Sequence, residues 1–352
     1  MARNGQNLTP PIGQYSGLPD DSPGGPVPAA IVGLGRIASL LEDDALREKP
    51  CTHAGAIFAC PDCTLTAGAD TSAERRRLFA ERWNVPVYDN AATMLAERSC
   101  KILCVATHPD SHLFYCNLAA RMGVPVVICE KPLADSLRSA RKIAALASKT
   151  RIVVNHERRY AADYNEARSI LMNETLGRTL SVKATLFMGK NRRLIDVLWH
   201  DGTHLADAIM FLCGVSLRHE RRCGAAMRST DGTAFLYGNA LGFRPNGEPA
   251  SMPFCIETGA GRDHLVFEID VSCEAGRLLI GNGVFEVYNS APSAYAERFR
   301  SLAKARSGFE GLTGYFSGML ADAVSCARDE TVKPVSGAEQ ALAVIEYLSQ
   351  IR

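Results

Sequence analysis

The sequence predicts an α/β protein in which a doubly wound parallel sheet is followed by an α+β domain with a large, mainly antiparallel open sheet. Three observations support this. Apolar runs alternate with helical patterns from about residue 27 to 156, and a glycine-rich turn follows the first run. Beyond residue 156 the strand-like segments follow one another with few helices between them. Strands that alternate with helices are typical of parallel sheets, whereas strands that follow one another without helices between them are typical of antiparallel sheets.

The length and charge of the chain limit its class. Its 352 residues suffice for two domains. The net charge of +1 gives no support to a nucleic-acid or anionic-membrane partner. No apolar stretch approaches the ~18 residues of a membrane span, and the N-terminus lacks the apolar core of a signal peptide, so we expect a cytoplasmic protein. Residues 1–26, rich in Pro, Gly, Asn and Asp, are expected to form a disordered tail.

The first domain is predicted to span residues 27–156. Its expected strands are short and apolar, near residues 28–32, 63–70, 101–107, 124–130 and 151–155. Helical patterns between them cover Ala73–Trp83, Ser111–Met122 and Ser136–Ser148. The polar, turn-prone stretch from Glu42 to Asp62, which contains two prolines, is predicted to be an inserted loop.

The second domain is predicted to span residues 157–352. Strands are expected at Ser181–Phe187, Ala234–Asn239, Leu265–Ser272 and Arg277–Ile280. Closing helices are expected at Gly311–Ala327 and Gly337–Gln350, and the last of these could pack back on the first domain.

The turn after the first strand carries a dinucleotide-binding pattern, Gly33-Leu34-Gly35-Arg36-Ile37-Ala38. Gly33 makes the tight turn, and Gly35 has no side chain to keep a pyrophosphate from the backbone. Ala38 lets a following helix pack closely, so that its amides face the phosphates. We therefore expect Gly33, Gly35, Arg36 and Ile37 to contact a dinucleotide.

The second predicted strand ends in Asp70, whose carboxylate can accept hydrogen bonds from the adenosine ribose hydroxyls. Its charge would repel a 2′-phosphate, so we expect NAD rather than NADP. The nearby Arg75, Arg76 and Arg77 could favour a phosphate instead. Asp70 could also serve as the N-cap of the next helix.

The third strand ends in Thr107-His108-Pro109 at the same edge of the sheet. Thr107 and Pro109 are expected to line the nicotinamide side of the cleft. His112 is included among the cofactor contacts, although an ordinary place in the first helical turn also accounts for it.

The fourth strand ends in Glu130-Lys131-Pro132, where a proline must turn the chain away from the sheet. Lys131 at this ligand-binding edge can touch a substrate hydroxyl beside the cofactor, and Glu130 is expected to border the cofactor. The alternative is a surface lysine at a strand end.

His200, Asp201 and His204 place three ionisable groups within five residues. A neutral histidine near pH 7 can take a proton from an alcohol, and a carboxylate can fix its tautomer. Alternatively, Asp201 caps the helix that begins there. No third ligand stands at zinc spacing, and Cys60-Pro-Asp-Cys63 is the only CxxC pair among twelve cysteines, so no metal is predicted.

Together these segments resemble the glucose–fructose oxidoreductase / inositol dehydrogenase (Gfo/Idh/MocA) family over roughly residues 28–350. The segments that carry the resemblance are the glycine turn at Gly33, Ala106-Thr-x-Pro-x-x-His112, Glu130-Lys131-Pro132, Asn155–Tyr160 and His204-x-x-Asp207. The resemblance implies a Rossmann domain that binds NAD(P), a second domain whose sheet mediates oligomerisation, and interconversion of a secondary alcohol and a ketone on a sugar, cyclitol or sugar derivative, nucleotide-linked sugars included.

By position, Lys131 resembles the family's catalytic lysine and His204 its catalytic histidine. The family often has an aspartate four residues before that histidine, where this chain has His200, with Asp201 one residue later. Either Asp201 has taken over that role, or His200 participates directly, or the proton path differs.

The remaining expectations concern the substrate and the partners. Candidate substrate contacts are Arg158, Arg159, Tyr160, Arg192 and Arg193, whose basic residues could bind an anion or form a solvated face. A homodimer or homotetramer is expected. The alternatives to a dehydrogenase are an NAD-dependent glycosidase that oxidises its sugar only transiently and a non-catalytic NAD-binding regulator.

Overall fold

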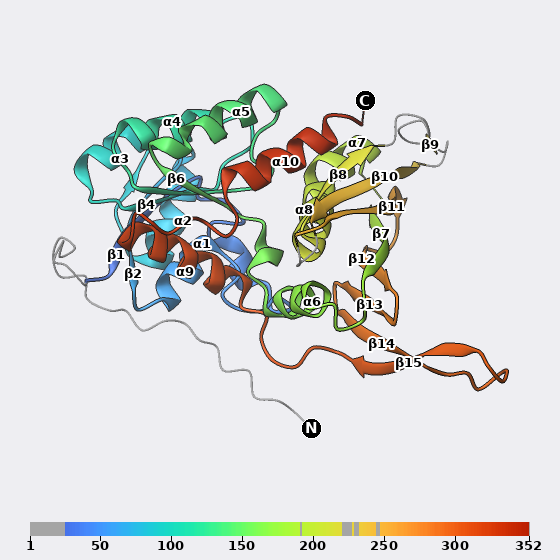
Figure 1. The fold of residues 1–352 in the computed structure, drawn as a ribbon. Coiled ribbons are helices and arrows are strands. Elements are labelled where there is room, and N and C mark those ends of the chain that lie inside the picture. The colour runs from blue at the N-terminus through green and yellow to red at the C-terminus, as the bar shows by residue number, and fades with distance from the viewer. Residues whose placement is uncertain (1–24, 191, 220–226, 229–231, 244–246, 352) are drawn as a thin grey trace.

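The computed structural model describes residues 25–190, 192–219, 227–228, 232–243 and 247–351, and these form two sheets lying side by side (Figure 1). All but the last two residues of the predicted N-terminal tail lie outside the described part. None of the helices in these ranges is long and apolar enough to cross a membrane.

The first sheet is parallel and has the order β3-β2-β1-β4-β5-β6. Its strands are β1 (Val27–Val32), β2 (Cys63–Ala69), β3 (Val87–Tyr88), β4 (Ile102–Val105), β5 (Val126–Cys129) and β6 (Arg151–Val154). Every residue of β1, β4 and β5 is buried, as expected for a sheet covered on both faces. The strand order reverses between β1 and β4, which opens a crevice at their carboxyl ends. The predicted doubly wound sheet is confirmed.

The helices of this half are α1 (His53–Ala59), α2 (Ala73–Trp83), α3 (Ala91–Glu97), α4 (His112–Arg121) and α5 (Leu137–Ala145). Ser72, not Asp70, caps α2, because its side chain accepts the amide hydrogen of Arg75. The alternative of Asp70 as the helix cap is therefore wrong.

The segment after the glycine turn differs from the prediction. In place of a regular helix it forms one distorted turn and a short 3₁₀ helix, Leu40–Asp43. The predicted loop from Glu42 to Asp62 in fact contains α1, whose Ala54, Ala56 and Ile57 are buried in the core. The two prolines of this stretch flank the helix instead of breaking it. The inserted part is therefore shorter, residues 40–52, and we call it the 40–52 insertion.

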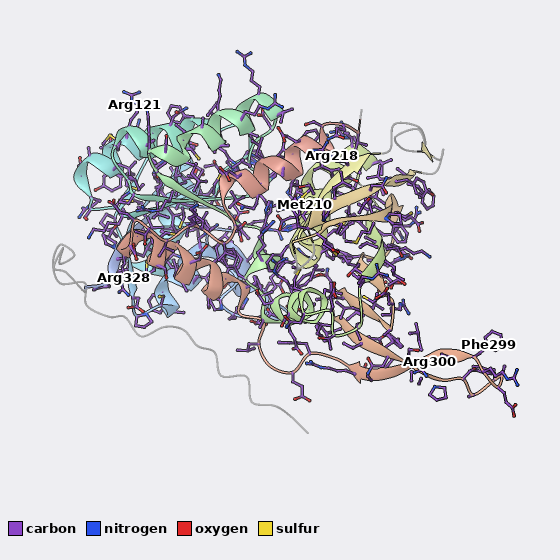
Figure 2. All side chains as sticks on the ribbon, in the orientation of Figure 1. Arg121, Met210, Arg218, Phe299, Arg300 and Arg328 are labelled. Carbon is purple, nitrogen blue, oxygen red and sulfur yellow. The ribbon has the colours of Figure 1, made fainter. Side chains whose placement is uncertain are left out.

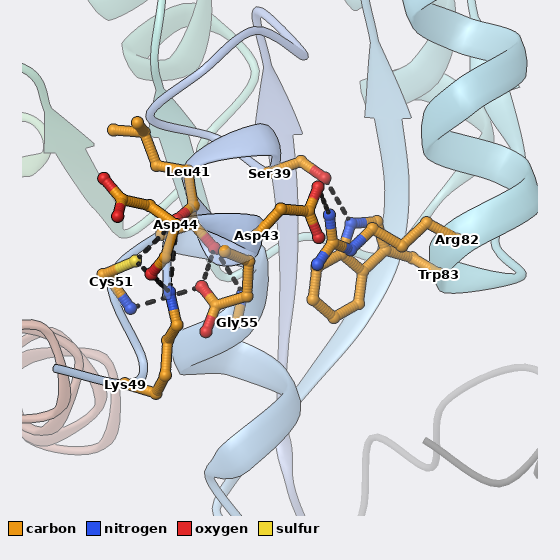
Figure 3. A network of polar contacts seen from close by, with 11 residues as sticks. Ser39, Leu41, Asp43, Asp44, Lys49, Cys51, Gly55, Arg82 and Trp83 are labelled. Atoms are coloured by element: carbon orange, nitrogen blue, oxygen red, sulfur yellow. Dashed lines mark hydrogen bonds and ion pairs between the residues drawn. The ribbon is translucent and has the colours of Figure 1, made fainter. Parts of the chain in front are cut away.

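Polar contacts hold the 40–52 insertion in place (Figure 3). The Glu42 carboxylate accepts hydrogen bonds from Cys51 N at 3.2 Å and from Thr52 Oγ1 at 2.6 Å. A Cβ at Gly55 would collide with this carboxylate, so the glycine makes room for it. The ammonium of Lys49 donates to the carbonyl oxygen of Asp44 at 2.7 Å. The insertion is thus a fixed part of the fold.

A second anchor joins the insertion to the C-terminal part of the chain. The Glu48 carboxylate accepts hydrogen bonds from Thr313 N at 2.8 Å, Thr313 Oγ1 at 3.0 Å and Gly314 N at 2.6 Å. These amides precede α9 (Tyr315–Arg328), so a carboxylate from a distant loop satisfies donors at a helix N-terminus.

The second sheet is mainly antiparallel and has the order β15-β14-β13-β12-β7-β11-β10-β8, with β9 paired to β10; only β7 and β11 run parallel in the described residues. The strands are β7 (Thr179–Gly189), β8 (Val215–His219), β9 (Met227–Arg228), β10 (Thr233–Phe243), β11 (Pro249–Arg262), β12 (Val266–Cys273), β13 (Gly276–Gly281), β14 (Val284–Pro292) and β15 (Arg300–Ser307). The β14–β15 hairpin projects from the body, with Phe299 and Arg300 on its outer part (Figure 2). The predicted large sheet is confirmed.

Helices α6 (Ala162–Met172) and α8 (Gly202–Cys213) cover one face of this sheet, and α7 (Leu194–Asp196) precedes α8. Helix α9 packs on the parallel sheet through Phe316, Met319 and Leu320. Helix α10 (Ala338–Leu348) lies between the two halves (Figure 1). It contributes Ala341 and Ile345 to the first core and Val344 and Tyr347 to the second.

A buried ion cluster joins α8 to the segment that follows β6. The Asp207 carboxylate of α8 accepts a hydrogen bond from Arg159 Nε at 2.9 Å, and His156 Nδ1 lies 3.0 Å from its Oδ1. Burial alone would raise the pKa of Asp207, but the charges of His156 and Arg159 outweigh it, and the pKa is lowered. Asp207 is thus ionised, and it ties α8 to the segment after β6.

We predict that Asp207→Ala destabilises the protein by about 3–5 kcal/mol, because it leaves a buried guanidinium without its counter-charge. The measurement is urea denaturation followed by circular dichroism. Asp196→Ala, which removes an exposed partner of Arg193, is the matched control and should change stability little. Equal stability of the Asp207 variant and the native protein would contradict the structural role of this cluster.

Candidate active site

A cleft of about 910 Å³ lies at the carboxyl ends of the parallel strands. The glycine turn, Asp70 and the ends of β4 and β5 form one wall, and the segment that leads into α8 forms the other. Sequence-predicted residues that line it are Gly33, Gly35, Arg36, Ile37, Asp70, Thr107, Pro109, Glu130, Lys131, Arg192, His200, Asp201 and His204. Segments far apart in the sequence are therefore brought to one place.

The glycine turn fits a dinucleotide. Gly33 has a φ of +84°, and a Cβ there would lie 2.7 Å from the carbonyl oxygen of Ala106, so only glycine is accommodated. At Gly35 a Cβ would meet nothing closer than Arg75 Nη1 at 3.9 Å. The protein itself therefore does not require glycine at this position. A side chain at Gly35 would instead stand in the cleft, where a pyrophosphate must approach the backbone.

Asp70 lies at the adenosine end of the cleft. Its Oδ2 accepts the amide hydrogen of Leu34 at 2.8 Å, and its Oδ1 accepts that of Ser72 at 2.8 Å. Arg75 Nη1 lies 3.6 Å from Oδ2, with half of the arginine side chain exposed. The carboxylate is thus fixed between two backbone amides, and each oxygen retains a lone pair for a ligand hydroxyl.

The structure places His112 outside the cleft. Its ring is buried, with Nε2 3.1 Å from the carbonyl oxygen of Thr107 and Nδ1 3.3 Å from that of Leu133. Burial lowers the pKa of His112. The predicted direct cofactor contact is therefore wrong. His112 instead contacts the backbone carbonyls of Thr107 and Leu133 and fixes their positions.

Glu130 is a buried carboxylate held by two hydrogen bonds. His53 Nε2 lies 2.8 Å from Oε1, and Asn155 Nδ2 donates to the same oxygen at 2.7 Å. Burial alone would raise the pKa of Glu130, but the partners His53 and Asn155 outweigh it, and the pKa is lowered. The end of β5 is thereby fixed to α1 and to the residue after β6.

Lys131 reaches across the cleft to the second half. Its Nζ donates to the carbonyl oxygen of His200 at 3.1 Å and lies 3.4 Å from His200 Nδ1. Burial lowers the pKa of Lys131, although nearby carboxylates, first that of Glu130, oppose the shift. A lowered pKa makes the ammonium a readier hydrogen-bond donor to developing negative charge.

His204 is the one residue of α8 that is only partly buried. Its side chain borders both the cleft and a second cavity. Burial lowers the pKa of His204 well below its ordinary value, and the charge of Lys131 lowers it further. The imidazole is therefore neutral at physiological pH and able to accept a proton.

The structure separates the roles left open for His200 and Asp201. Asp201 Oδ2 accepts a hydrogen bond from Arg192 at 2.6 Å, and its Oδ1 lies 3.0 Å from His200 Nδ1. Neither oxygen is hydrogen-bonded to His204. The two residues belong to a single π-helical turn, Val197–Asp201, and the carbonyl oxygen of His200 accepts hydrogen bonds from Lys131 Nζ and from Thr203 Oγ1. Such turns recur at functional sites.

The second cavity, of about 410 Å³, lies beside the cleft and shares Arg47, Glu157, Asp201 and His204 with it. Of the predicted substrate residues, Arg158 lines this cavity and Arg192 lines the cleft. The others line neither: Arg159 is bound to Asp207, Tyr160 to Asp322 and Arg193 to Asp196. Asp207 is buried, whereas Asp196 is exposed; the structure brings none of these three expected substrate contacts to either cavity.

Sequence reasoning missed several residues of the site. No role was assigned to His53, Asn155 or Tyr315, although Asn155 begins a segment that carries the family resemblance, and Arg47 comes from the 40–52 insertion. A basic residue in an insertion next to a dinucleotide turn was the available signal for Arg47. No group of three or more potential metal ligands gathers anywhere in the described ranges.

Comparisons with known proteins agree with this geometry. A family model described as an oxidoreductase family with an NAD-binding Rossmann fold (Gfo/Idh/MocA) matches residues 27–157. Oxidoreductase YceM of Salmonella typhimurium is 29% identical over 44% of this chain and 50% of its own length. Inositol 2-dehydrogenase of Gluconacetobacter diazotrophicus is 32% identical over 36% of this chain and 37% of its own length. The matches thus span half or less of these relatives.

A solved dehydrogenase structure from Chromobacterium violaceum has a TM-score of 0.73 at 17% identity and covers 92% of this chain and 94% of that one. At this identity the likeness shows the shared fold. Residues 27–157 are thus similar to the Gfo/Idh/MocA family of oxidoreductases, which has an NAD-binding Rossmann fold.

Proposed function

We propose that this chain is an NAD(P)-dependent oxidoreductase that interconverts a secondary alcohol and a ketone on a sugar, a cyclitol or a derivative of one. The observation that carries the proposal is the position of His204. All other residues of α8 are buried, whereas His204 borders both cavities. Its lowered pKa favours the neutral imidazole.

The cofactor would lie in the larger cleft. Gly33 and Gly35 would leave room for its pyrophosphate, and the carboxylate of Asp70 would accept hydrogen bonds from its adenosine ribose. When bound, it supplies the hydride acceptor. The substrate would occupy the smaller cavity, with its hydroxyl group between Lys131 and His204. His204 accepts the hydroxyl proton at an imidazole nitrogen, and the ammonium of Lys131 stabilises negative charge on the oxygen.

We assign His200 and Asp201 to positioning. The carbonyl of His200 holds the Lys131 ammonium, and Asp201 fixes His200 and Arg192. We propose a corresponding division of the chain: residues 27–156 bind the cofactor, and residues 157–352 bind the substrate and form the oligomer.

We predict that Lys131→Met and His204→Asn each lower turnover roughly 100-fold, as expected for loss of a charge-stabilising donor and of a general base. Both variants should keep native cofactor affinity. The assay is NADH formation with a panel of sugars, cyclitols and nucleotide-sugars, with Lys142→Met on the surface of α5 as control. Near-native turnover of both variants, with intact circular dichroism, would mean that the active site lies elsewhere.

The same assay separates the alternatives. A dehydrogenase accumulates NADH and a ketone. Release of an aglycone without net NADH would identify a glycosidase, and the absence of both reactions would identify a regulator.

We predict a bell-shaped pH dependence of kcat/KM. The acid limb reports protonation of His204, whose pKa lies below the ordinary 6.5, so activity should be full at pH 6.5 and fall only at lower pH. The alkaline limb reports deprotonation of the Lys131 ammonium. Its midpoint should lie below 10.5, the ordinary pKa of lysine, because burial lowers the pKa of Lys131. His204→Asn should remove the acid limb. An inflection between pH 6.5 and 8 that His204→Asn abolishes would contradict the burial of this histidine.

We predict that the protein prefers NAD to NADP, because the ionised Asp70 would repel a 2′-phosphate. Calorimetric titration with both cofactors measures the preference, and Asp70→Ser should narrow it. Gly35→Val should abolish binding of both without loss of fold, since its side chain would stand in the cleft. Tighter binding of NADP by the native protein, with Arg75 beside the carboxylate, would refute the assignment of Asp70.

We predict at least a homodimer, formed through the outer face of the second sheet. Tyr237, Leu241 and Phe243 alternate along β10 on that face and are exposed, Phe243 by 68%. A monomeric mass by light scattering at micromolar concentration would refute this. Replacement of Leu241 and Phe243 by glutamate should dissociate the oligomer, because it places charge in the interface.

A further inference from the structure

We propose that the smaller cavity accepts a substrate that carries a carboxylate, and that Arg47 of the 40–52 insertion recognises this group. The inference rests on the proposed function, since it specifies the class of substrate for the same site. The predicted substrate is thus a sugar acid or a similar hydroxy acid, not a neutral sugar.

Two guanidinium groups border the cavity from opposite halves of the molecule. Arg47 comes from the Rossmann half, and Arg158 comes from the segment after β6. Arg158 is oriented by its surroundings: its guanidinium lies 3.8 Å from the ring centroid of Phe267, and Nη2 donates to Asn282 Oδ1 at 3.2 Å. A group held in this way presents its remaining N–H donors in a fixed direction.

Arg47 is available to a ligand. Its nearest carboxylate is that of Asp44 at 3.4 Å, and the two side chains are 44% and 42% exposed. An exposed pair of this kind contributes little and is readily exchanged for another anion. Arg47 also borders the cofactor cleft, so it lies close to the place where hydride transfer would occur.

The loop that carries Arg47 is rigid enough to select a ligand. Glu48, the next residue, accepts three hydrogen bonds from Thr313 and Gly314. Before Arg47, the carbonyl oxygen of Asp44 accepts a hydrogen bond from Lys49 Nζ at 2.7 Å (Figure 3). Arg47 is thus presented between fixed residues, and a ligand would not have to order the loop.

Two of the carboxylates around the cavity are engaged by arginines other than Arg47. Glu157 accepts a hydrogen bond from Arg158 at 3.2 Å, and Asp201 accepts one from Arg192 at 2.6 Å. The third, Asp163, has a pKa that burial raises, and its Oδ1 accepts the amide hydrogen of Tyr164 at 2.9 Å. A ligand that displaced water from Arg47 without offering a charge would leave this guanidinium poorly solvated. An anionic group on the ligand offsets that cost.

A carboxylate suits this site better than a phosphate ester. Glu157 and Asp201 border the same cavity, and their charges would repel a dianion more strongly than a monoanion. Arg47 can bind a planar carboxylate through two parallel hydrogen bonds.

The test is calorimetric titration of the full chain in the presence of saturating NADH. The ligands are D-glucuronate, D-galacturonate and D-gluconate, with D-glucose and D-galactose as neutral counterparts and glucose 6-phosphate as the phosphate. We expect at least one carboxylate to bind about tenfold or more tightly than its neutral counterpart, the difference of one charge-assisted contact. Arg47→Leu should remove this difference, and Arg47→Lys should restore part of it.

Arg193→Leu is the matched control, because Arg193 is an exposed arginine outside both cavities. It should leave all affinities unchanged. Equal binding of neutral and acidic ligands, no binding of any carboxylate, or an unaltered preference in Arg47→Leu would each overturn the proposal. Preferential binding of the phosphate would overturn the assignment to a carboxylate.

The outcomes also separate this inference from the proposed function. NADH formation from neutral sugars alone would refute the carboxylate site but support the proposed dehydrogenase activity. Binding of carboxylates through Arg47 without NADH formation from any ligand would refute the dehydrogenase and leave the anion site standing.

Discussion

The position of Lys131 depends on one buried carboxylate. Glu130 cannot remain ionised in the core without hydrogen bonds, and His53 and Asn155 supply them from two other segments. This requirement fixes the end of β5 against α1 and against the residue that follows β6. Lys131, the next residue, therefore leaves the sheet toward the second half, where the carbonyl of His200 accepts its hydrogen bond. The hydrogen bonds that Glu130 requires therefore determine where Lys131 lies.

The second half supplies His204 through an equally strict constraint. Helix α8 is buried along its whole length except at His204, and the Asp207 ion cluster ties it to the segment after β6. Helix α10 contributes to the cores of both halves, and Glu48 joins the 40–52 insertion to the start of α9. These contacts hold Lys131 and His204 at one cleft, although they belong to different sheets. They also place Arg47 at the wall of the smaller cavity.

Local patterns in the sequence were sufficient for much of this site. Gly33, Gly35 and Lys131 could be placed because each follows a strand of a parallel sheet, and the carboxyl ends of such strands share an edge. Arg159 and His112 could not be assigned correctly, because their partners, Asp207 and the carbonyl of Leu133, are distant in sequence. The prediction placed α1 in a loop, because this short helix directly follows the polar 40–52 insertion. Strands β11 and β14 were not predicted, although residues 284–288 of β14 have the alternating apolar and β-branched composition of a strand.

The central claim is that Lys131 and His204 share one site and interact. The most direct test is the pKa of His204, measured by NMR titration of the imidazole in the native protein and in Lys131→Met. The account predicts a pKa below the ordinary 6.5 in the native protein and a rise in Lys131→Met, because the ammonium of Lys131 lowers it. A native pKa at 6.5 or above that is unchanged in Lys131→Met would contradict the account.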